Sequence, residues 1–191
     1  MGMGPWDHGV ELAIFEGKNP MPRYVAFLRG VSPMNCRMAE LKRAFESAGF
    51  KQVKTVLASG NVAFDSPKAT PAALEKKVEA AVKKVLGREF FTIVRPVDEL
   101  AALLETDPYK PFKVAPKAKR VVTFLREAPT PKPALPLEKD GAHVLALQGR
   151  ELFTAYVPLA NQPVFMTLIE KVAGKEQTTR TWDTLRKVVV A

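Results

Sequence analysis

The spacing of apolar residues along residues 21–96 most constrains how this chain can fold. Short apolar runs typical of strands alternate with apolar residues at helical spacing, in the order β-α-β-β-α-β. The strands are expected at Tyr24–Leu28, Gln52–Ala58, Val62–Asp65 and Phe90–Arg95, and the helices at Met38–Ala48 and Leu74–Val85. Gly49 and Gly87 end the two helices. This order is that of a split βαβ unit, so we predict a ferredoxin-like subdomain over residues 21–96.

The second half, residues 97–191, has a less regular pattern that proline-rich stretches interrupt. Helices are expected at Val97–Leu104, Val164–Val172 and Trp182–Val189, and strands at Val121–Leu125, Val144–Leu147 and Leu152–Val157. Gln148-Gly149-Arg150 joins the last two strands as a hairpin turn. We therefore predict a second, smaller α+β subdomain that packs on the first, and an α+β class for the whole chain.

Residues 1–20 have a different composition from the rest of the chain. Glycine and proline punctuate this stretch, its apolar residues gather only at Leu12–Phe15, and a second Met-Pro start follows at Met21. No basic segment precedes an apolar one, so the stretch does not resemble a secretory signal. We expect a leader or an over-extended start that takes no part in the fold.

The counts of cysteine and histidine restrict the chemistry that the chain can perform. One cysteine and two histidines in 191 residues exclude an intrachain disulfide framework and argue against a metal site. The single thiol fits a reducing cytoplasm, and no apolar run is long enough to suggest a membrane partner. Cys36 precedes a predicted helix, and Arg37 beside it would lower the pKa of its thiol. No positioned base is evident, because His8 lies in the leader and His143 in the second half. We find no catalytic motif and expect no cofactor, which leaves enzymatic activity open.

Several short sequence blocks are similar to those of a known family. The blocks are Tyr24–Val31, Met38–Leu41, Ser59–Phe64 and Thr179–Thr184. In this order they resemble the signature of the bacterial "domain of unknown function 1697" family, and they span nearly all of residues 21–190. The resemblance implies an α+β fold with ferredoxin-like subdomains and no assigned activity. The chain departs from the family pattern at Val31–Cys36, which lacks the glycine pair often found there.

The first and second predicted strands run parallel in a split βαβ unit, so their carboxyl ends share one edge of the sheet. That edge gathers Arg29-Gly30, the loop residues Ser32 and Asn35, and the turn Ser59-Gly60-Asn61. Ligands often bind at the carboxyl ends of strands, and a guanidinium suits phosphate or carboxylate. We therefore predict a cleft here for a small anionic ligand. In the alternative interpretation, Arg29 pairs with a carboxylate or a loop carbonyl and the Ser59 segment is only a turn.

Arg180 and Trp182 near the C-terminus also allow two interpretations. Thr181 is a good N-cap for the last helix, and Trp182 would then pack its indole in the core. In the functional interpretation, Arg180 lies beside Arg29 as a second contact to the anion, and Trp182 borders the cleft. The two alternatives differ in whether these side chains converge in the folded protein.

The positive charge is concentrated in the first half. The formal charge is +9, and residues 21–96 hold 14 basic but 6 acidic residues. Lys76, Lys77, Lys83, Lys84 and Arg88 form one candidate basic surface, and Lys110–Arg120 form a second with interleaved aromatic residues. The carboxylates Glu40, Glu46, Glu75 and Glu79 are expected on solvated helix faces. The alternative function is therefore a non-enzymatic module that uses its basic helix surface to bind nucleic acid or protein, although an RNA-stacking motif is not evident.

Overall fold

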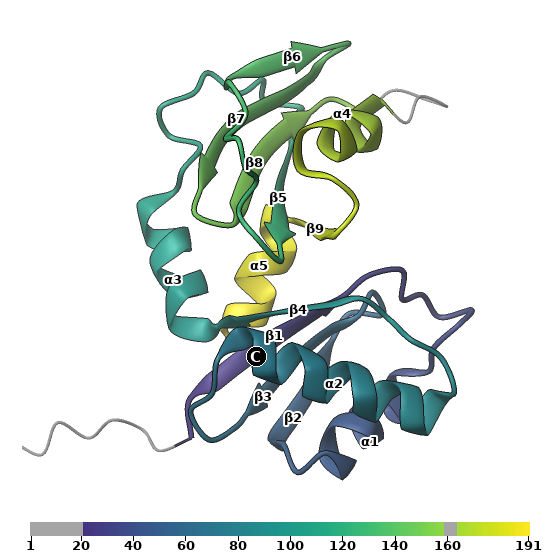
Figure 1. Ribbon diagram of the computed structural model, residues 1–191. Helices are drawn as coiled ribbons and strands as arrows, with labels where there is room; N and C mark the ends of the chain where they lie inside the picture. The colour runs from purple at the N-terminus through teal and green to yellow at the C-terminus, as the bar shows by residue number, and fades with distance from the viewer. Residues whose placement is uncertain (1–20, 159–163) are drawn as a thin grey trace, which may run out of the picture.

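The computed structural model describes residues 21–158 and 164–191; the predicted leader, residues 1–20, lies outside them. The described residues form an α+β fold with two antiparallel sheets (Figure 1). The elements are β1 Arg23–Leu28, α1 Met38–Ser47, β2 Lys51–Val56, β3 Asn61–Asp65, α2 Pro71–Leu86, β4 Thr92–Pro96, α3 Val97–Thr106, β5 Lys119–Leu125, β6 Leu137–Lys139, β7 Ala142–Gln148, β8 Glu151–Tyr156, α4 Val164–Ala173, β9 Gln177–Thr181 and α5 Trp182–Val189.

The first sheet confirms the predicted element order, with strands arranged β2-β3-β1-β4 and every neighbouring pair antiparallel. Because β1 and β2 are both antiparallel to β3, they run in the same direction and their carboxyl ends lie at one edge. The turn before β3 needs a glycine. Gly60 has a φ of +77°, and a Cβ there would lie 2.8 Å from the carbonyl oxygen of Leu28.

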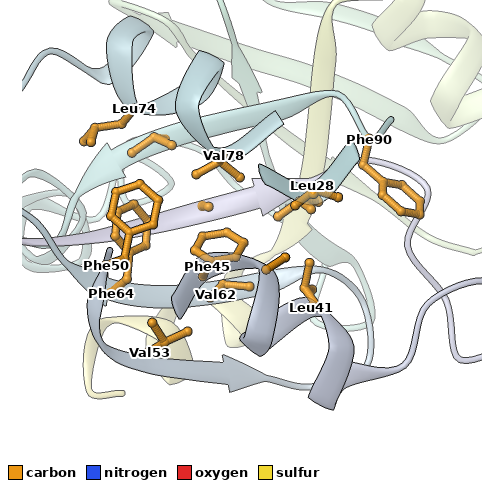
Figure 2. Close-up of a cluster of buried hydrophobic side chains, with 14 of the residues drawn as sticks. Leu28, Leu41, Phe45, Phe50, Val53, Val62, Phe64, Leu74, Val78 and Phe90 are labelled. Atoms are coloured by element: carbon orange, nitrogen blue, oxygen red, sulfur yellow. The ribbon is translucent and has the colours of Figure 1, made fainter. Parts of the chain in front are cut away.

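Helices α1 and α2 pack side by side on one face of the first sheet (Figure 1). Figure 2 shows the buried cluster between them and the sheet, in which the rings of Phe45, Phe50 and Phe64 lie with centroids 4.5–5.8 Å apart. Gly87 closes α2 at a φ of +69°, as predicted, and Thr70 caps its start by accepting a hydrogen bond from the Ala73 N–H.

The opposite face of the first sheet is also buried. Val25, Phe27 and Ile93 pack into a second cluster with α3, α5 and the second sheet. The ring of Phe27 stacks on that of Phe124 with a centroid distance of 4.4 Å and an interplanar angle of 8°. Both faces of the sheet are therefore covered, which agrees with the expectation that it carries no RNA-stacking platform.

The second sheet has the order β6-β7-β8-β5-β9, with α4 on its outer side (Figure 1). It contains the predicted strands and the predicted hairpin, in which Gly149-Arg150 connects β7 to β8. Two strands were not predicted. Strand β6 has three exposed residues, and β9, with the sequence Gln-Thr-Thr-Arg-Thr, lacks apolar alternation. Strand β9 forms by pairing with β5 over five residue pairs, a tertiary interaction that suits its β-branched threonines.

Candidate anion site at the edge of the first sheet

The carboxyl end of β1 is held between its two neighbouring strands. The Leu28 N–H donates to the Gly60 carbonyl at 2.8 Å, and the Arg29 N–H donates to the Phe91 carbonyl at 2.8 Å. These two bonds bring the segments that precede β3 and β4 against the end of β1. Three of the sequence blocks, which contain Arg29, Gly60 and Arg180, meet at this edge.

The Arg180 guanidinium is the centre of this meeting point. It extends from β9 and its Nη2 donates to the carbonyl oxygens of Leu28, Ser59 and Gly60 at 2.8, 3.2 and 3.3 Å. Its Nε donates to Asn61 Oδ1. Its Nη1 donates to the Thr178 hydroxyl and the Thr179 carbonyl, each at 2.7 Å. The structure therefore brings Ser59, Gly60, Asn61 and Arg180 together.

The positive charge of Arg180 has no carboxylate partner among the residues that the structure describes. Its acceptors are neutral oxygens, and the ring of Phe27 lies 5.4 Å from the guanidinium carbon. Removal from water lowers the pKa of Arg180 to about 10, so the group is still charged near pH 7. A cation without a counter-ion thus lies beneath this edge of the sheet.

The Arg29 side chain contacts residues of the second half that precede β9. Its Nη1 donates to the Lys175 carbonyl, and its Nη2 lies 3.4 Å from Glu170 Oε1 on α4. The alternative interpretation of Arg29, pairing with a carboxylate and a loop carbonyl, therefore describes its contacts. The side chain is 37% exposed and makes these contacts with its two terminal nitrogens.

Gly30, Ser32 and Asn35 form a loop whose polar groups bind one another. Asn35 Nδ2 donates to the Gly30 carbonyl at 2.8 Å, and the Ser32 N–H donates to Asn35 Oδ1 at 2.9 Å. Gly30 has a φ of +77°, which suits glycine at this turn. The loop follows Arg29 directly, and these two side-chain contacts lie within the loop itself.

Trp182 agrees with the packing interpretation. Its indole is 4% exposed and lies edge-on to Tyr109 with a centroid distance of 5.1 Å. Thr181 caps α5 by accepting from the Thr184 N–H at 3.2 Å, as the sequence predicted. Trp182 also borders an open hollow of about 560 Å³ that includes Arg120 and Arg186.

A buried charge network between the two halves was missed by the sequence analysis. Arg95 is 1% exposed, and its Nε lies 2.6 Å from Glu151 Oε1. Glu75 is 2% exposed; it accepts from the Val94 N–H at 3.0 Å and lies 3.6 Å from Arg126 Nε. The expectation that Glu75 lies on a solvated face is therefore wrong.

Glu79 is also turned inward, with only a quarter of its side chain exposed. It accepts from the Thr92 N–H at 2.9 Å and from Arg126 Nη2 at 2.6 Å. Arg126 in turn donates to the Thr92 carbonyl at 2.8 Å and lies over the Phe91 ring. The sequence did contain a signal of this network: Arg95 is a charged residue in an otherwise apolar strand, and a buried charge needs a partner.

Cys36 differs from the expectation of a lowered thiol pKa. The residue is 4% exposed, and burial raises the pKa of its thiol, assisted by the Glu40 carboxylate and opposed by Arg88. The thiol lies 3.8 Å from the Arg37 carbonyl. Desolvation at this position therefore outweighs any effect of the helix end.

Within residues 21–158 and 164–191, no group of three or more histidine, cysteine, aspartate or glutamate residues is placed to hold a metal ion. The same residues include no helix long and apolar enough to cross a membrane.

Comparisons with known proteins identify one protein family and a solved structure with a similar fold. The conserved bacterial protein SP0830 from Streptococcus pneumoniae has a similar fold, with a TM-score of 0.65 and 20% sequence identity; the match covers 89% of this chain and 98% of that one. No curated protein matches the chain. The family described as "Protein of unknown function (DUF1697)" matches residues 21–153. The matched region is more than half of the chain and contains β1, α1 and the Ser59-Gly60-Asn61 turn, so the chain belongs to this family.

Proposed function

We propose that this protein binds a small anion, carrying a phosphate or a carboxylate, at the edge of the first sheet. One observation carries the proposal: the half-buried Arg180 guanidinium contacts only neutral oxygens and has no carboxylate partner among the described residues. A partly buried positive charge without a counter-ion favours an anion nearby.

Arg180 acts as a positioning residue in this proposal. Its Nε and Nη2 bond to Leu28, Ser59 and Asn61, and its Nη1 bonds to β9 itself, so it holds the edge together and supplies a fixed charge. Arg29 makes the direct contact, because it is partly exposed at the same edge and a guanidinium has five N–H donors. Ser59 is exposed, and its hydroxyl accepts a hydrogen bond from Asn61 Nδ2 at 3.1 Å. An arriving anion would compete with Glu170 for Arg29, at the 3.4 Å contact that now joins them.

The test is a thermal-shift screen with inorganic phosphate, phosphosugars, nucleotides and organic acids. A ligand at 100 times its Kd adds about 2.7 kcal/mol of stability, which corresponds to a rise in Tm of roughly 5–11 °C for a chain of this size. Arg29→Met is expected to abolish the rise. Arg186→Met is the matched control, since it also removes an exposed arginine that contacts one carboxylate, at 3.2 Å. The proposal fails if no member of the panel stabilises the wild type, or if the Arg29 variant is stabilised equally.

We also propose a finer description of the fold and its location. The strand order β2-β3-β1-β4 supports a ferredoxin-like subdomain over residues 21–96, with a second α+β subdomain over residues 97–191. The single cysteine supports a reducing compartment, and we propose the cytoplasm.

A further inference from the structure

The buried positions of Glu75 and Glu79 change the charge that α2 presents to solvent. These are the only acidic residues of α2, and both are bound by arginines and by β4 N–H groups. Their negative charges are thus compensated by contacts within the protein. The outer side of α2 keeps its lysines without an acidic residue from the same helix.

The exposed cations of α1 and α2 are mostly unpaired. Lys83 is paired with Glu89, which follows the helix, and Lys42 of α1 is paired with Glu46. The remaining exposed basic residues, for which the described residues provide no ion pair, are Arg37, Arg43, Lys76, Lys77, Lys84 and Arg88. We call these six residues the helical basic face. Arg43 and the three lysines lie on α1 and α2, while Arg37 directly precedes α1 and Arg88 follows the end of α2. The two helices are adjacent and cover the side of the first sheet turned away from the second sheet (Figure 1).

Two of the lysines of α2 lie one after the other along the helix axis. Lys77 and Lys84 are seven residues apart, which is two turns or about 10.5 Å. The Lys77 ammonium lies 4.8 Å from the centre of the Phe50 ring, so its stem packs along the protein surface. A surface of this kind suits a partner with repeated negative charges rather than a single ion.

The surroundings of the helical basic face distinguish a nucleic acid from a membrane. A helix that lies in a membrane interface inserts an apolar side into the acyl region. The apolar residues of α1 and α2, such as Leu41 and Val78, are fully buried against the sheet, and the exposed large hydrophobic residues of the described chain lie outside both helices. The exposed surface of α1 and α2 therefore carries charge and no large hydrophobic residue, which suits contact with a phosphate backbone.

We propose that the helical basic face binds the phosphate backbone of nucleic acid without sequence preference. The helical basic face does not include Arg29 or Arg180, and its test variants keep both arginines, so the proposal stands or fails independently of the small-anion site. The lysines contact phosphates, and the binding energy comes largely from the release of counterions.

The experiment measures fluorescence anisotropy of the full chain with a fluorescein-labelled DNA duplex of mixed sequence, over about 50–200 mM salt. The test variant is Lys76→Gln/Lys84→Gln, in which both residues are exposed. Each lysine that contacts a phosphate is expected to lower the slope of log K against log salt by about 0.9. The control is Lys132→Gln/Lys139→Gln, which removes the same charge from exposed positions of the second half that belong to neither candidate basic surface.

The expected result is binding by the wild type that weakens with salt, a shallower slope for the α2 variant and an unchanged slope for the control. The proposal is overturned if the duplex is not bound at low salt, or if both double variants lose the same amount. Binding to phosphatidylserine vesicles that exceeds binding to DNA would also overturn it, since it would assign the surface to membranes. Circular dichroism of each variant confirms that the fold is retained.

Discussion

Replacing Arg180 with methionine tests whether this side chain holds the two halves together. The substitution keeps an apolar stem of similar length and removes every hydrogen bond of the guanidinium. Asn61 Oδ1 and the Leu28 carbonyl each lose a donor, and both residues are fully buried. The Gly60 carbonyl keeps its bond from the Leu28 N–H.

The expected loss in the free energy of unfolding follows from these two acceptors. A buried polar group left without its partner costs about 1–3 kcal/mol, so the pair predicts a loss of about 2–6 kcal/mol in the free energy of unfolding. With a urea m-value of ~2 kcal/mol/M, the unfolding midpoint falls by roughly 1–3 M. A lysine at this position keeps the charge but provides one donor group instead of a planar fork, so Arg180→Lys is expected to fall between the two.

The assay is urea unfolding followed by circular dichroism, with the m-value compared between variants to confirm that only stability has changed. A loss below about 0.5 kcal/mol for Arg180→Met is the range of an ordinary surface substitution. It would refute the conclusion that the hydrogen bonds of Arg180 hold the two halves together.

Three further substitutions follow from the structure. Gly60→Ala is expected to destabilise the fold more than Gly87→Ala in urea unfolding, because both glycines have positive φ but only the first would place a Cβ against backbone, at 2.8 Å; equal losses would contradict this. Glu75→Gln leaves a buried arginine underpaired and is expected to cost about 3–5 kcal/mol by the same measurement, and a neutral result would contradict a charged network. Burial raises the pKa of Tyr109 well above its ordinary value, so the folded state retains this proton and stability falls as the pH rises above about 10. In Tyr109→Phe that alkaline loss is expected to be smaller in pH-dependent thermal unfolding, and an unchanged profile would contradict the assignment.

The predictable part of the fold was the part with local signals. The apolar periodicity around Leu41 and Val78, together with glycines at helix ends, defined α1 and α2, and the short apolar runs defined β1 and β4. The parallel course of β1 and β2 also follows from the element order, and it is enough to predict that Ser59-Gly60-Asn61 lies next to the end of β1.

The parts that were not predicted depend on contacts between distant segments. Strand β9 has no pattern of its own and exists because β5 offers a partner. The inward orientation of Glu75 depends on Arg126, 51 positions later in the numbering, whose nitrogen lies 3.6 Å away. The direction of the Arg29 side chain is set by Glu170 on α4. A helical wheel of α2 places Glu75 beside the apolar stripe but contains no information about these partners.

The hydrogen bonds along β4 have a consequence for association between molecules. Strand β4 is at the edge of the first sheet, where unpaired N–H and carbonyl groups ordinarily attract a strand from another chain. Here the outward N–H groups of Thr92 and Val94 are occupied by glutamates, and the Thr92 carbonyl is occupied by Arg126 from the second half. The two glutamates of α2 and Arg126 of the second half thus cover this edge of the sheet together. A fragment that ended after β4 would lack Arg126 and would be prone to strand-by-strand aggregation.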